Sequence, residues 1–534
     1  MPTLNWIGKD KIVNHDKEVP FRLLKKNKKY SLGENENLIV EGDNLEALKA
    51  LMPFYHGQVK CIYIDPPYNT GNEKWVYNDK VNSPKIKEWL GRAVGPEGED
   101  LTRHDKWLCM MYPRLKLLRD LLSKDGAIFV SIDDNEQHHL RILMDGIFGE
   151  DNFITNIIWQ KKFSPQNDAK YFSDDHDFIV VYAKMKNISS DKSGWVRNLL
   201  PRTEEADARY SNPDSDPRGP WTSGDLLRKD VQKTGLYKII TPASRKCVPP
   251  VGTSWRVPEY SYKELLADNR IWFGSNGKGV PRIKRFLSEV QQGIVPLTIW
   301  FRNEAGDTDS ARKEIKEIFH DSKEPFQTPK PSKLIEKILR IATNKDSIIL
   351  DSFAGSGTTG HAVLDLNKED GGNRKFILVE MEKDIARGIT AERIRKVAKG
   401  YSYKKNGGET VKVKGLGGGF EYVELGEALF NSNGMINDSV SFEDMSRYVF
   451  FTETHTNLDK NKIKGNYIGG FAEIHYFLFF DGIGKNILDR NSLKELKAKE
   501  GKKIVYADKC LLGEEILEKY QIIFKQIPYQ IKVY

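Results

Sequence analysis

A carboxylate, two prolines and an aromatic ring follow one another at the end of an apolar run. The apolar residues 61–64 lead directly into the tetrapeptide Asp65-Pro66-Pro67-Tyr68. A proline fixes φ near about −65° and has no backbone N–H, so this turn offers carbonyl acceptors with few competing donors. Such a turn suits a ligand that brings N–H donors, and an aromatic ring can stack on a base with roughly 1–3 kcal/mol. The tetrapeptide therefore indicates a pocket for a flat base with an exocyclic amine.

The chemistry of that pocket would be activation of the amine. The exocyclic nitrogen of a purine is a weak nucleophile because its lone pair is delocalised into the ring. If Asp65 and the carbonyl of Pro66 each accepted one of its N–H groups, the lone pair would be localised for attack. An adenine flipped out of DNA is the best candidate for this base. Asp and Pro are also frequent in ordinary turns, so the tetrapeptide alone leaves both interpretations open.

A second turn has the pattern of a nucleotide-binding site. An apolar run at residues 347–351 ends in Asp351, small residues and glycines fill residues 352–359, and a helical pattern follows at residues 361–366. A strand, a glycine turn and a helix N-terminus allow a ligand to approach the backbone closely. This context makes the turn a candidate cofactor site.

An acidic residue follows the next predicted strand. Residues 375–379 are apolar, and Glu380 comes directly after them. In Rossmann-like halves, a carboxylate at such a position binds ribose hydroxyls. Glu382 is a competing candidate for the same role. Up to this point, dinucleotides and S-adenosylmethionine fit equally well.

The order of these motifs resembles the β-class amino DNA methyltransferases, in which the catalytic motif precedes the cofactor motif. Within that class the chain is most similar to the modification (Mod) subunits of Type III restriction-modification systems, over roughly its first three quarters. The similarity is carried by five segments in the family's order, residues 41–48, 63–71, 125–134, 326–331 and 353–359.

The resemblance implies S-adenosyl-L-methionine as the cofactor and gives roles to individual residues. Asp65, Pro66, Pro67 and Tyr68 would be catalytic. The cofactor-binding residues that it implies are Asp43, Lys330, Asp351, Phe353, Ala354, Gly355, Gly357, Thr358 and Glu380.

Some of these roles are specific. Asp43 would lie near the adenine of the cofactor, Glu380 would bind its ribose, and Lys330 would close over its methionine carboxylate. Phe163 is a candidate for the second face of a base sandwich, and a core position is the alternative for that ring.

The activity implied is methyl transfer to N6 of a flipped-out adenine in double-stranded DNA. The amine attacks the methyl group in line, without a metal and without a covalent enzyme intermediate. Asp65 acts as a hydrogen-bond acceptor rather than as a strong base. An N4-cytosine methyltransferase is one alternative, although that activity more often has Ser or Asn at the position of Asp65. A dinucleotide-dependent oxidoreductase would leave the Asp-Pro-Pro-Tyr turn without a role.

The implied partners are double-stranded DNA, a second copy of the chain and a translocase-nuclease restriction subunit. The chain has no G-x-x-x-x-G-K-[ST] phosphate loop, so translocation would depend on that subunit. A stand-alone methyltransferase, and a protein that serves mainly as a DNA-binding specificity subunit, are the alternatives. The sequence does not indicate the recognition site or the methylated strand.

Composition agrees with a large DNA-binding protein. At 534 residues the chain should contain more than one domain. A formal net charge of +8 favours a polyanionic partner. The four cysteines are far apart in the sequence, which indicates reduced thiols rather than a disulfide framework or a zinc site. The chain shows neither a signal peptide nor a membrane segment, so we expect a cytoplasmic protein.

The pattern of strands and helices predicts an α/β protein with a Rossmann-like S-adenosylmethionine-dependent methyltransferase fold. A mainly parallel sheet should carry helices on both faces. The predicted parts are a polar N-terminal leader (1–37), a catalytic half (38–185), an inserted target-recognition domain (186–325), a cofactor-binding half (326–400) and a small α/β C-terminal assembly or partner domain (401–534). The leader has a basic stretch at 22–29 that could lie along a phosphate backbone, although solvated surface is the more common role of such a stretch.

The two halves should form one sheet, because neither half alone contains a complete site. Asp65 and Asp351 are then neighbours at the carboxyl ends of its strands. Helices are predicted from residue 44 and at 105–122, 135–148, 332–342, 384–398 and 514–520, and strands at 127–132, 154–160, 177–183, 347–351, 375–379, 502–508 and 522–528.

Overall fold

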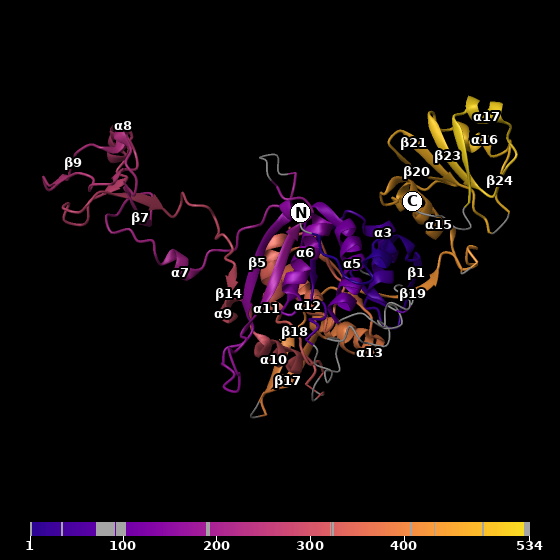
Figure 1. Ribbon diagram of the computed structural model, residues 1–534, viewed down its shortest axis with the longest axis horizontal. Coiled ribbons are helices and arrows are strands. Elements are labelled where there is room, and N and C mark those ends of the chain that lie inside the picture. Colours follow the sequence, from indigo (N-terminus) through magenta and orange to yellow (C-terminus); the bar gives the residue numbers. More distant parts are fainter. Residues whose placement is uncertain are drawn as a thin grey trace. The chain divides into compact units, whose positions relative to one another are not determined.

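The computed structural model describes residues 3–33, 36–70, 91, 103–187, 193–320, 322, 325–405, 408–431, 433–482 and 485–527. The chain divides into two compact units (Figure 1). The main unit contains Met1–Asn198 and Leu297–Tyr534, and the inserted unit contains Leu199–Pro296. The inserted unit lies within the predicted insertion at residues 186–325 and is shorter than it.

A ten-stranded sheet forms the centre of the main unit. Its strands, in spatial order, are β1 (Arg22–Lys26), β19 (Glu421–Ala428), β2 (Leu38–Glu41), β16 (Lys375–Glu380), β15 (Ile348–Asp351), β3 (Val59–Ile64), β4 (Leu122–Ile132), β6 (His176–Ala183), β5 (Phe153–Gln160) and β14 (Ile299–Trp300). The pairs β1/β19, β4/β6 and β5/β6 are antiparallel, and the other six neighbouring pairs are parallel. The predicted mainly parallel α/β sheet is confirmed.

The two halves of the predicted site meet at the centre of this sheet. Strand β15 lies directly beside β3 and runs parallel to it, with Leu350 opposite Ile62. Parallel strands end at the same edge, so the residues that follow β3 and the last residue of β15 are brought together. Asp65 is close enough to Asp351 to help raise the pKa of that carboxyl, after burial as the main cause. The prediction that the halves form one sheet is confirmed.

Helices cover both faces of the sheet. Leu350 and Val379 belong to one core with residues of helices α3, α5 and α6. On the other face, the side chain of Leu378 lies beside Gly360 of α12 and Ile394 of α14. A sheet buried on both faces explains why its central strands are continuously apolar. Within the described residues up to 399, the α-helices of the main unit are α1 (Lys9–Ile12), α2 (His15–Glu18), α3 (Asn44–Tyr55), α5 (Arg103–Leu121), α6 (Gln137–Phe148), α9 (Arg302–Ala305), α10 (Thr308–Ile318), α11 (Ser332–Ala342), α12 (Thr358–Asp370), α13 (Lys383–Ile385) and α14 (Ala391–Lys399).

One predicted helix has a defect. The segment expected to be helical at residues 384–398 contains a π-helical turn at Ala386–Thr390 between α13 and α14. Thr390 donates its hydroxyl to the carbonyl of Gly355, at 2.6 Å. The irregular turn therefore supports the glycine turn of the candidate cofactor site.

The basic stretch in the N-terminal leader includes an edge strand, and its lysines are exposed as predicted. Arg22–Lys26 form β1, the antiparallel partner of β19, and Leu23 is buried. Lys26 forms an ion pair with Glu421 of that strand. Charges on an edge strand discourage pairing with other chains, which accounts for the basic composition without a phosphate partner.

The inserted unit has its own small core. A three-stranded sheet has the order β12 (Ile271–Trp272), β13 (Arg282–Phe286) and β7 (Trp221–Asp225). Lys284 is buried in an ion pair with Asp216, at 3.1 Å. The remaining elements are α7 (Glu204–Asp207), β8 (Leu227–Arg228), β9 (Ile239–Ile240), β10 (Lys246–Cys247), β11 (Ser254–Trp255) and α8 (Glu259–Ala267).

The chain returns to the main unit earlier than the predicted boundary at residue 325. Strand β14 pairs in parallel with β5, and Trp300 is fully buried. Helices α9 and α10 follow it directly. This short segment thereby extends the main sheet at its edge.

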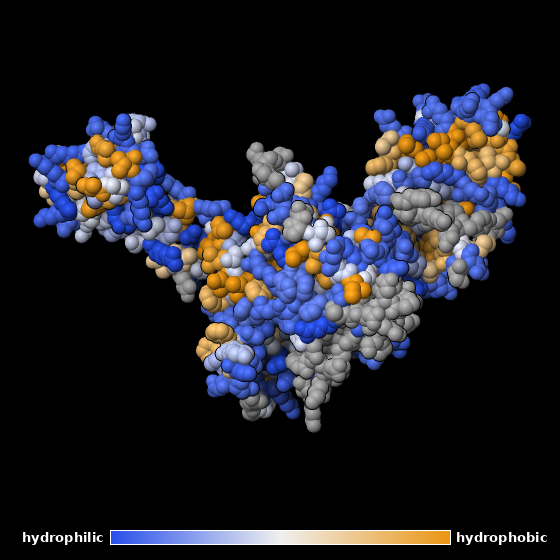
Figure 2. All heavy atoms as spheres, in the orientation of Figure 1, coloured by the Kyte–Doolittle hydropathy of each residue, from blue (hydrophilic) through white to orange (hydrophobic). Residues whose placement is uncertain are grey.

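The C-terminal part has a second, four-stranded sheet in the order β20 (Tyr467–Phe471), β21 (Ile474–Leu478), β23 (Lys502–Ala507) and β25 (Ile522–Gln526). The predicted strand, helix and strand near residues 502–528 correspond to β23, α17 (Glu514–Lys519) and β25. Apolar side chains gather over this sheet (Figure 2). The other elements after residue 399 are β17 (Gly400–Lys404), β18 (Thr410–Lys414), α15 (Phe442–Thr454), β22 (Ile487–Leu488), α16 (Leu493–Lys497) and β24 (Lys509–Cys510).

Within the described ranges, no helix combines the length and the apolar composition that a membrane span requires.

Candidate active site

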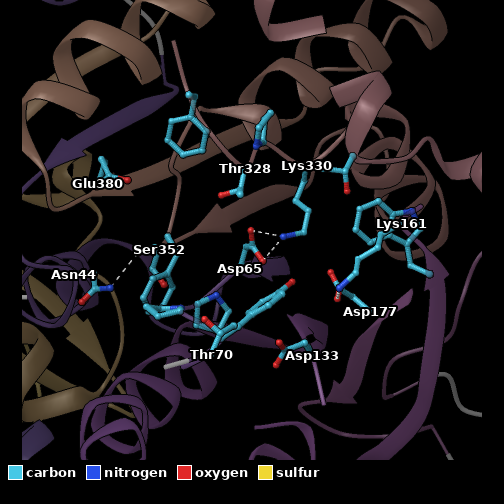
Figure 3. Close-up of a pocket in the computed structure, with 18 of the residues that line it drawn as sticks. Asn44, Asp65, Thr70, Asp133, Lys161, Asp177, Thr328, Lys330, Ser352 and Glu380 are labelled. Atoms are coloured by element: carbon cyan, nitrogen blue, oxygen red, sulfur yellow. Dashed lines mark hydrogen bonds and ion pairs between the residues drawn. The ribbon is translucent and has the colours of Figure 1, made fainter. Parts of the chain in front are cut away.

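A cavity of about 400 Å³ opens at the carboxyl ends of the central strands (Figure 3). Both halves of the main unit contribute to its wall. Glu380 and Ser352 lie on one side of Asp65, and Asp133, Lys161 and Asp177 lie on the other. The residues around it are Asn44, Asp65, Pro66, Pro67, Tyr68, Thr70, Met110, Arg114, Asp133, Trp159, Lys161, Lys162, Asp177, Thr308, Arg312, Phe326, Thr328, Pro329, Lys330, Ser352, Phe353, Val379, Glu380 and Met381.

All four residues of the Asp-Pro-Pro-Tyr turn line this cavity. The turn is held from behind, because the buried indole of Trp107 donates to the carbonyl of Pro67 at 2.7 Å. Asn69, the next residue, has a left-handed backbone with φ of 59°. Its side-chain amide donates to the carbonyl of Arg103 at 3.1 Å and to the buried carboxylate of Glu136. The turn is thus a fixed feature of the cavity wall.

Lys330 joins the catalytic turn in this structure. Its ammonium lies 2.6 Å from each oxygen of Asp65 and 5.0 Å from the centre of the Tyr68 ring. Burial raises the pKa of Tyr68 well above its usual value, so the phenol stays neutral. Lys330 was predicted to contact the methionine carboxylate of the cofactor. The structure places its ammonium on the carboxylate that the reaction would use.

The glycine turn after β15 is built around a buried carboxyl. Asp351 accepts from the backbone N–H of Phe353 at 3.0 Å and from the hydroxyl of Thr359 at 2.6 Å. Burial raises its pKa to about 7. Gly357 caps α12 with φ of 78°, and a Cβ there would meet Thr390 at 3.2 Å. Glycine is favoured at this position, because the backbone is left-handed and a Cβ would require Thr390 to shift slightly.

Of the two candidates for a ribose contact, Glu380 lines the cavity. It is buried, and its two oxygens accept the backbone N–H groups of Gly355 and Glu382, each at 2.9 Å. Glu382 is absent from the cavity wall. Between the two candidates for a ribose contact, the geometry favours Glu380.

Four predicted cofactor residues form the frame of the turn rather than its surface. Of the residues at 353–358, Phe353 reaches the cavity, while Ala354, Gly355, Gly357 and Thr358 lie behind it. Ala354 donates to the carbonyl of Val379 at 3.1 Å. The hydroxyl of Thr358 donates to the carbonyl of Lys330 at 3.2 Å, which ties the turn to the segment opposite.

Asp43, which was predicted to contact the cofactor, is not among the residues of the cavity wall, whereas its neighbour Asn44 is. Asp43 caps α3 by accepting the backbone N–H groups of Leu45 and Glu46, at 2.9 and 3.1 Å. Asn44 lines the cavity and donates to the carbonyl of Ser352 at 3.3 Å. The Ser352 hydroxyl is buried and has no hydrogen-bond partner among the described residues. Asn44 and Ser352 were not predicted, although both lie next to predicted residues.

The second side of the cavity carries charges that sequence reasoning missed. Lys161 and Asp177 form an ion pair at 2.5 Å, and Asp177 is buried. Burial raises the pKa of Asp133. The indole of Trp159 is fixed by a 2.9 Å hydrogen bond to the carbonyl of Gly306. These residues stand at or beside the ends of β4, β5 and β6, so their convergence depends on antiparallel pairing that the motifs do not reveal.

Phe163 does not line the cavity. Its ring is 67 % exposed, and the guanidinium of Arg302 lies 4.0 Å from the ring centre. The structure therefore shows neither the core position nor the base sandwich that were considered for it. Trp159 is the aromatic ring that this segment contributes to the wall.

The arrangement combines an acceptor carboxylate, a neutral aromatic ring and a nucleotide-type turn in one cavity. The Asp65 carboxylate and the Pro66 carbonyl can accept an amine. The Glu380 carboxylate and the Ser352 hydroxyl provide polar contacts about the glycine turn. These are the groups that a transfer between a nucleoside cofactor and an amine requires.

Comparison with known proteins places this arrangement in a family. The family described as DNA methylase matches residues 59–392. The chain is 37% identical to the Type III restriction-modification enzyme StyLTI Mod subunit of Salmonella typhimurium over 73% of its length and 60% of that protein. It is 32% identical to the EcoP15I Mod subunit of Escherichia coli over 71% of its length and 64% of that protein.

A shorter relative is matched more completely. The chain is 32% identical to the Type II methyltransferase M.KpnI of Klebsiella pneumoniae over 67% of its length and 83% of that protein. The chain spans less than two thirds of the length of the two Type III subunits, whereas the family match includes the Asp-Pro-Pro-Tyr turn, the glycine turn and Glu380. The chain therefore belongs to the DNA methylase family.

Proposed function

We propose that this protein transfers a methyl group from S-adenosyl-L-methionine to N6 of a flipped-out adenine in double-stranded DNA. The observation that carries this proposal is that the Asp65–Tyr68 turn and the Phe353 and Glu380 side chains line one cavity. Family membership and the Mod names of the relatives support it.

The cavity has groups that fit the proposed cofactor. S-adenosyl-L-methionine has ribose hydroxyls, an adenine ring and a charged methionine end, and it supplies an electrophilic methyl group when bound. Glu380 is a buried carboxylate at the cavity wall, and Ser352 has a buried hydroxyl with no partner in the described part of the chain. Asn44 and Phe353 complete a wall that is both polar and apolar. We propose these four residues as the cofactor contacts, with Asp351, Ala354, Gly355, Gly357 and Thr358 as the frame and Asp43 as the helix cap.

The catalytic residues act by accepting hydrogen bonds and by stacking. Asp65 and the carbonyl of Pro66 accept the two N–H groups of the amine, which localises the nitrogen lone pair. Tyr68 stacks on the base. Pro67 keeps the turn rigid and accepts from Trp107. Lys330 now donates to both oxygens of Asp65, so the amine has to use the remaining lone pairs of that carboxylate or displace the ammonium.

Adenine is preferred to cytosine as the target base. The acceptor in the turn is the carboxylate of Asp65, whereas N4-cytosine enzymes more often have Ser or Asn there.

We also propose that the inserted unit recognises DNA. Arg228, Lys229 and Arg282 line a hollow of about 480 Å³ beside Trp272, and such side chains can bind phosphates and base edges.

We further propose that the chain works in the cytoplasm as a modification subunit. The word subunit in the names of the Type III relatives supports assembly with a restriction subunit, and the homodimer is proposed from the resemblance to that family. Copurification with a candidate restriction subunit encoded beside it, and light scattering of the purified chain, test these two partners. A monomer that retains no such subunit would support the stand-alone alternative.

Transfer of label from tritiated cofactor to duplex DNA tests the activity. We expect label in DNA with the parent chain and none with Asp65→Ala. Absence of label with the parent chain, when the cofactor still binds, would contradict the proposal and favour a DNA-binding specificity subunit.

A further inference from the structure

Two histidines and a glutamate meet outside the cavity, next to the catalytic turn. Glu136 comes directly before α6, His139 lies in the first turn of that helix, and His104 lies in the first turn of α5. The Nδ1 atom of His104 is 2.7 Å from one oxygen of Glu136, and that of His139 is 2.8 Å from the other. All three donor atoms lie within 4.8 Å of one another. The cluster therefore brings together three metal-ligating groups from two helices.

The buried carboxylate of this cluster favours the binding of a cation. The Glu136 carboxylate is fully buried. Among the described residues, no lysine or arginine forms an ion pair with it, and its partners are the two histidines and Asn69. A buried carboxylate is costly without positive charge nearby. An ion shared with two imidazoles would provide that charge.

The cluster is also accessible. The side chains of His104 and His139 are 34% and 22% exposed, although Glu136 is enclosed. An ion can therefore enter from the histidine side, and water can complete its coordination.

We propose that His104, Glu136 and His139 bind one divalent transition-metal ion of the zinc class. Two imidazole nitrogens and one carboxylate oxygen are a ligand set that suits zinc, whereas calcium and magnesium prefer oxygen ligands alone. The ion is separate from methyl transfer, for which the sequence indicated no metal.

Binding requires a change of tautomer. An Nδ1 atom that ligates an ion cannot also carry the proton that it now shares with Glu136, so each neutral imidazole holds its proton on Nε2. Arg103 currently donates to Nε2 of His104 at 3.3 Å. Because Arg103 is exposed, its guanidinium can turn into solvent when that nitrogen becomes a donor.

The site would act on the catalytic turn through Asn69. The amide of Asn69 donates to the same Glu136 carboxylate, and this residue follows Tyr68 directly with φ of 59°. A group that is hydrogen-bonded to a metal ligand and the ligand itself fix each other's orientation once the ion is bound. The ion would therefore fix the carboxylate that anchors the end of the turn.

Cobalt(II) titration of the full-length, untagged chain after treatment with a chelator tests this site. Visible absorption should report one bound equivalent, and added zinc should displace it. His104→Ala and His139→Ala should each weaken binding by at least about tenfold. His138→Ala is the matched control, because this exposed histidine has its ring centre 4.0 Å from that of His139 but is outside the ligand set. It should leave the affinity unchanged.

Two results would overturn the proposal. One is the absence of saturable binding by the parent chain, which would leave the cluster as a hydrogen-bonded anchor for Asn69. The other is equal loss of affinity in His104→Ala and His138→Ala. Thermal unfolding without metal checks the fold of each variant. If His139→Ala does not fold, the cobalt affinities of His104→Ala and Glu136→Gln decide whether the proposal holds.

Discussion

Asp65 is the residue on which the proposed chemistry depends. Its carboxylate accepts from Lys330 in the structure and would accept from the amine of the base during reaction. Replacing Asp65 with Ala should lower the methylation rate by at least about 100-fold, as expected when a preorganised hydrogen-bonding group is lost. Cofactor affinity should change little, because Glu380 and Ser352 remain. Single-turnover kinetics and equilibrium cofactor binding measure the two effects separately.

Asp134 provides the control for that substitution. It is an exposed acidic residue close in sequence to Asp133, and it is absent from the cavity wall. Asp134→Ala should keep the rate of the parent chain. Equal rates for Asp65→Ala and the parent would remove Asp65 from the mechanism.

Asp351 should make the stability of the protein depend on pH. Burial raises its folded pKa from 3.8 to about 7, so the unfolded chain ionises first as pH rises. Its contribution to the free energy of unfolding is at most about 4 kcal/mol. This contribution is fully present below pH 3.8 and is lost as pH rises through about 7. Asp351→Asn lacks this titration. The melting temperature of the variant relative to the parent should therefore increase between pH 5 and pH 8, measured without cofactor. A constant difference across this range would show that Asp351 does not titrate there.

At the same scale, the sequence indicated the site residues that lie within local motifs. Asp65 and Glu380 could be named because each directly follows an apolar strand. Lys161 and Asp177 could not, because their approach to Asp65 depends on how β6 pairs with β4 and with β5. Phe163 was chosen by its place in the chain, and the structure places Trp159 at the cavity instead.

At the scale of elements, Glu314 connects four helices that come together after the insertion. On α10, it accepts from Arg393 of α14 and from the N–H of Ser332 of α11, at 3.0 and 3.2 Å, and it lies 3.0 Å from His361 of α12. Burial alone would raise its pKa, but Arg393 and His361 outweigh burial and lower the pKa to about 2. The network thus stabilises the layer of helices that supports the glycine turn.

Glu314→Gln should lower the free energy of unfolding by about 3 kcal/mol at pH 7, because it leaves Arg393 buried without its partner. The stability that Glu314 provides is present above pH 4.5 and is lost as pH falls toward 2, so the difference should shrink in acid. Denaturant unfolding at several pH values measures it.

Glu369→Gln is the matched control, since Glu369 is 57% exposed in its ion pair with Arg340. It should cost less than about 1 kcal/mol. Equal losses in the two variants would mean that the Glu314 network has no special role.

Elements with strong local patterns could be predicted, and those defined by distant pairing could not. Helix α11 has the bounds that its apolar periodicity indicated. The basic strand β1 and the strand β19 are far apart in the chain, since the hydrogen bond from Arg22 to Gly426 joins residues separated by 404 positions. The turn between β20 and β21 lacks the usual sequence signal, because Ala472 and Glu473, rather than Gly or Asn, have the positive φ values there.

At the scale of the whole molecule, the two units should have separable roles. The candidate cofactor contacts all belong to the main unit, whereas Arg228, Lys229 and Arg282 belong to the inserted unit. Replacing these three residues with Ala should weaken DNA binding. It should also reduce the slope of log affinity against log salt concentration by about two to three, because up to three phosphate contacts are lost. Cofactor affinity should stay the same. DNA binding at several salt concentrations measures the first effect, and calorimetry measures the second.

Lys263→Ala in the same unit is the control, because its side chain is 69% exposed and outside the hollow. If the triple variant and this control bind DNA equally well, the hollow does not contact DNA.

The most direct test of the central proposal is mass spectrometry of nucleosides from DNA incubated with the chain and S-adenosyl-L-methionine. The account predicts N6-methyldeoxyadenosine with the parent chain and none with Asp65→Ala. N4-methyldeoxycytidine, or no modified nucleoside from a chain that binds both cofactor and DNA, would contradict it.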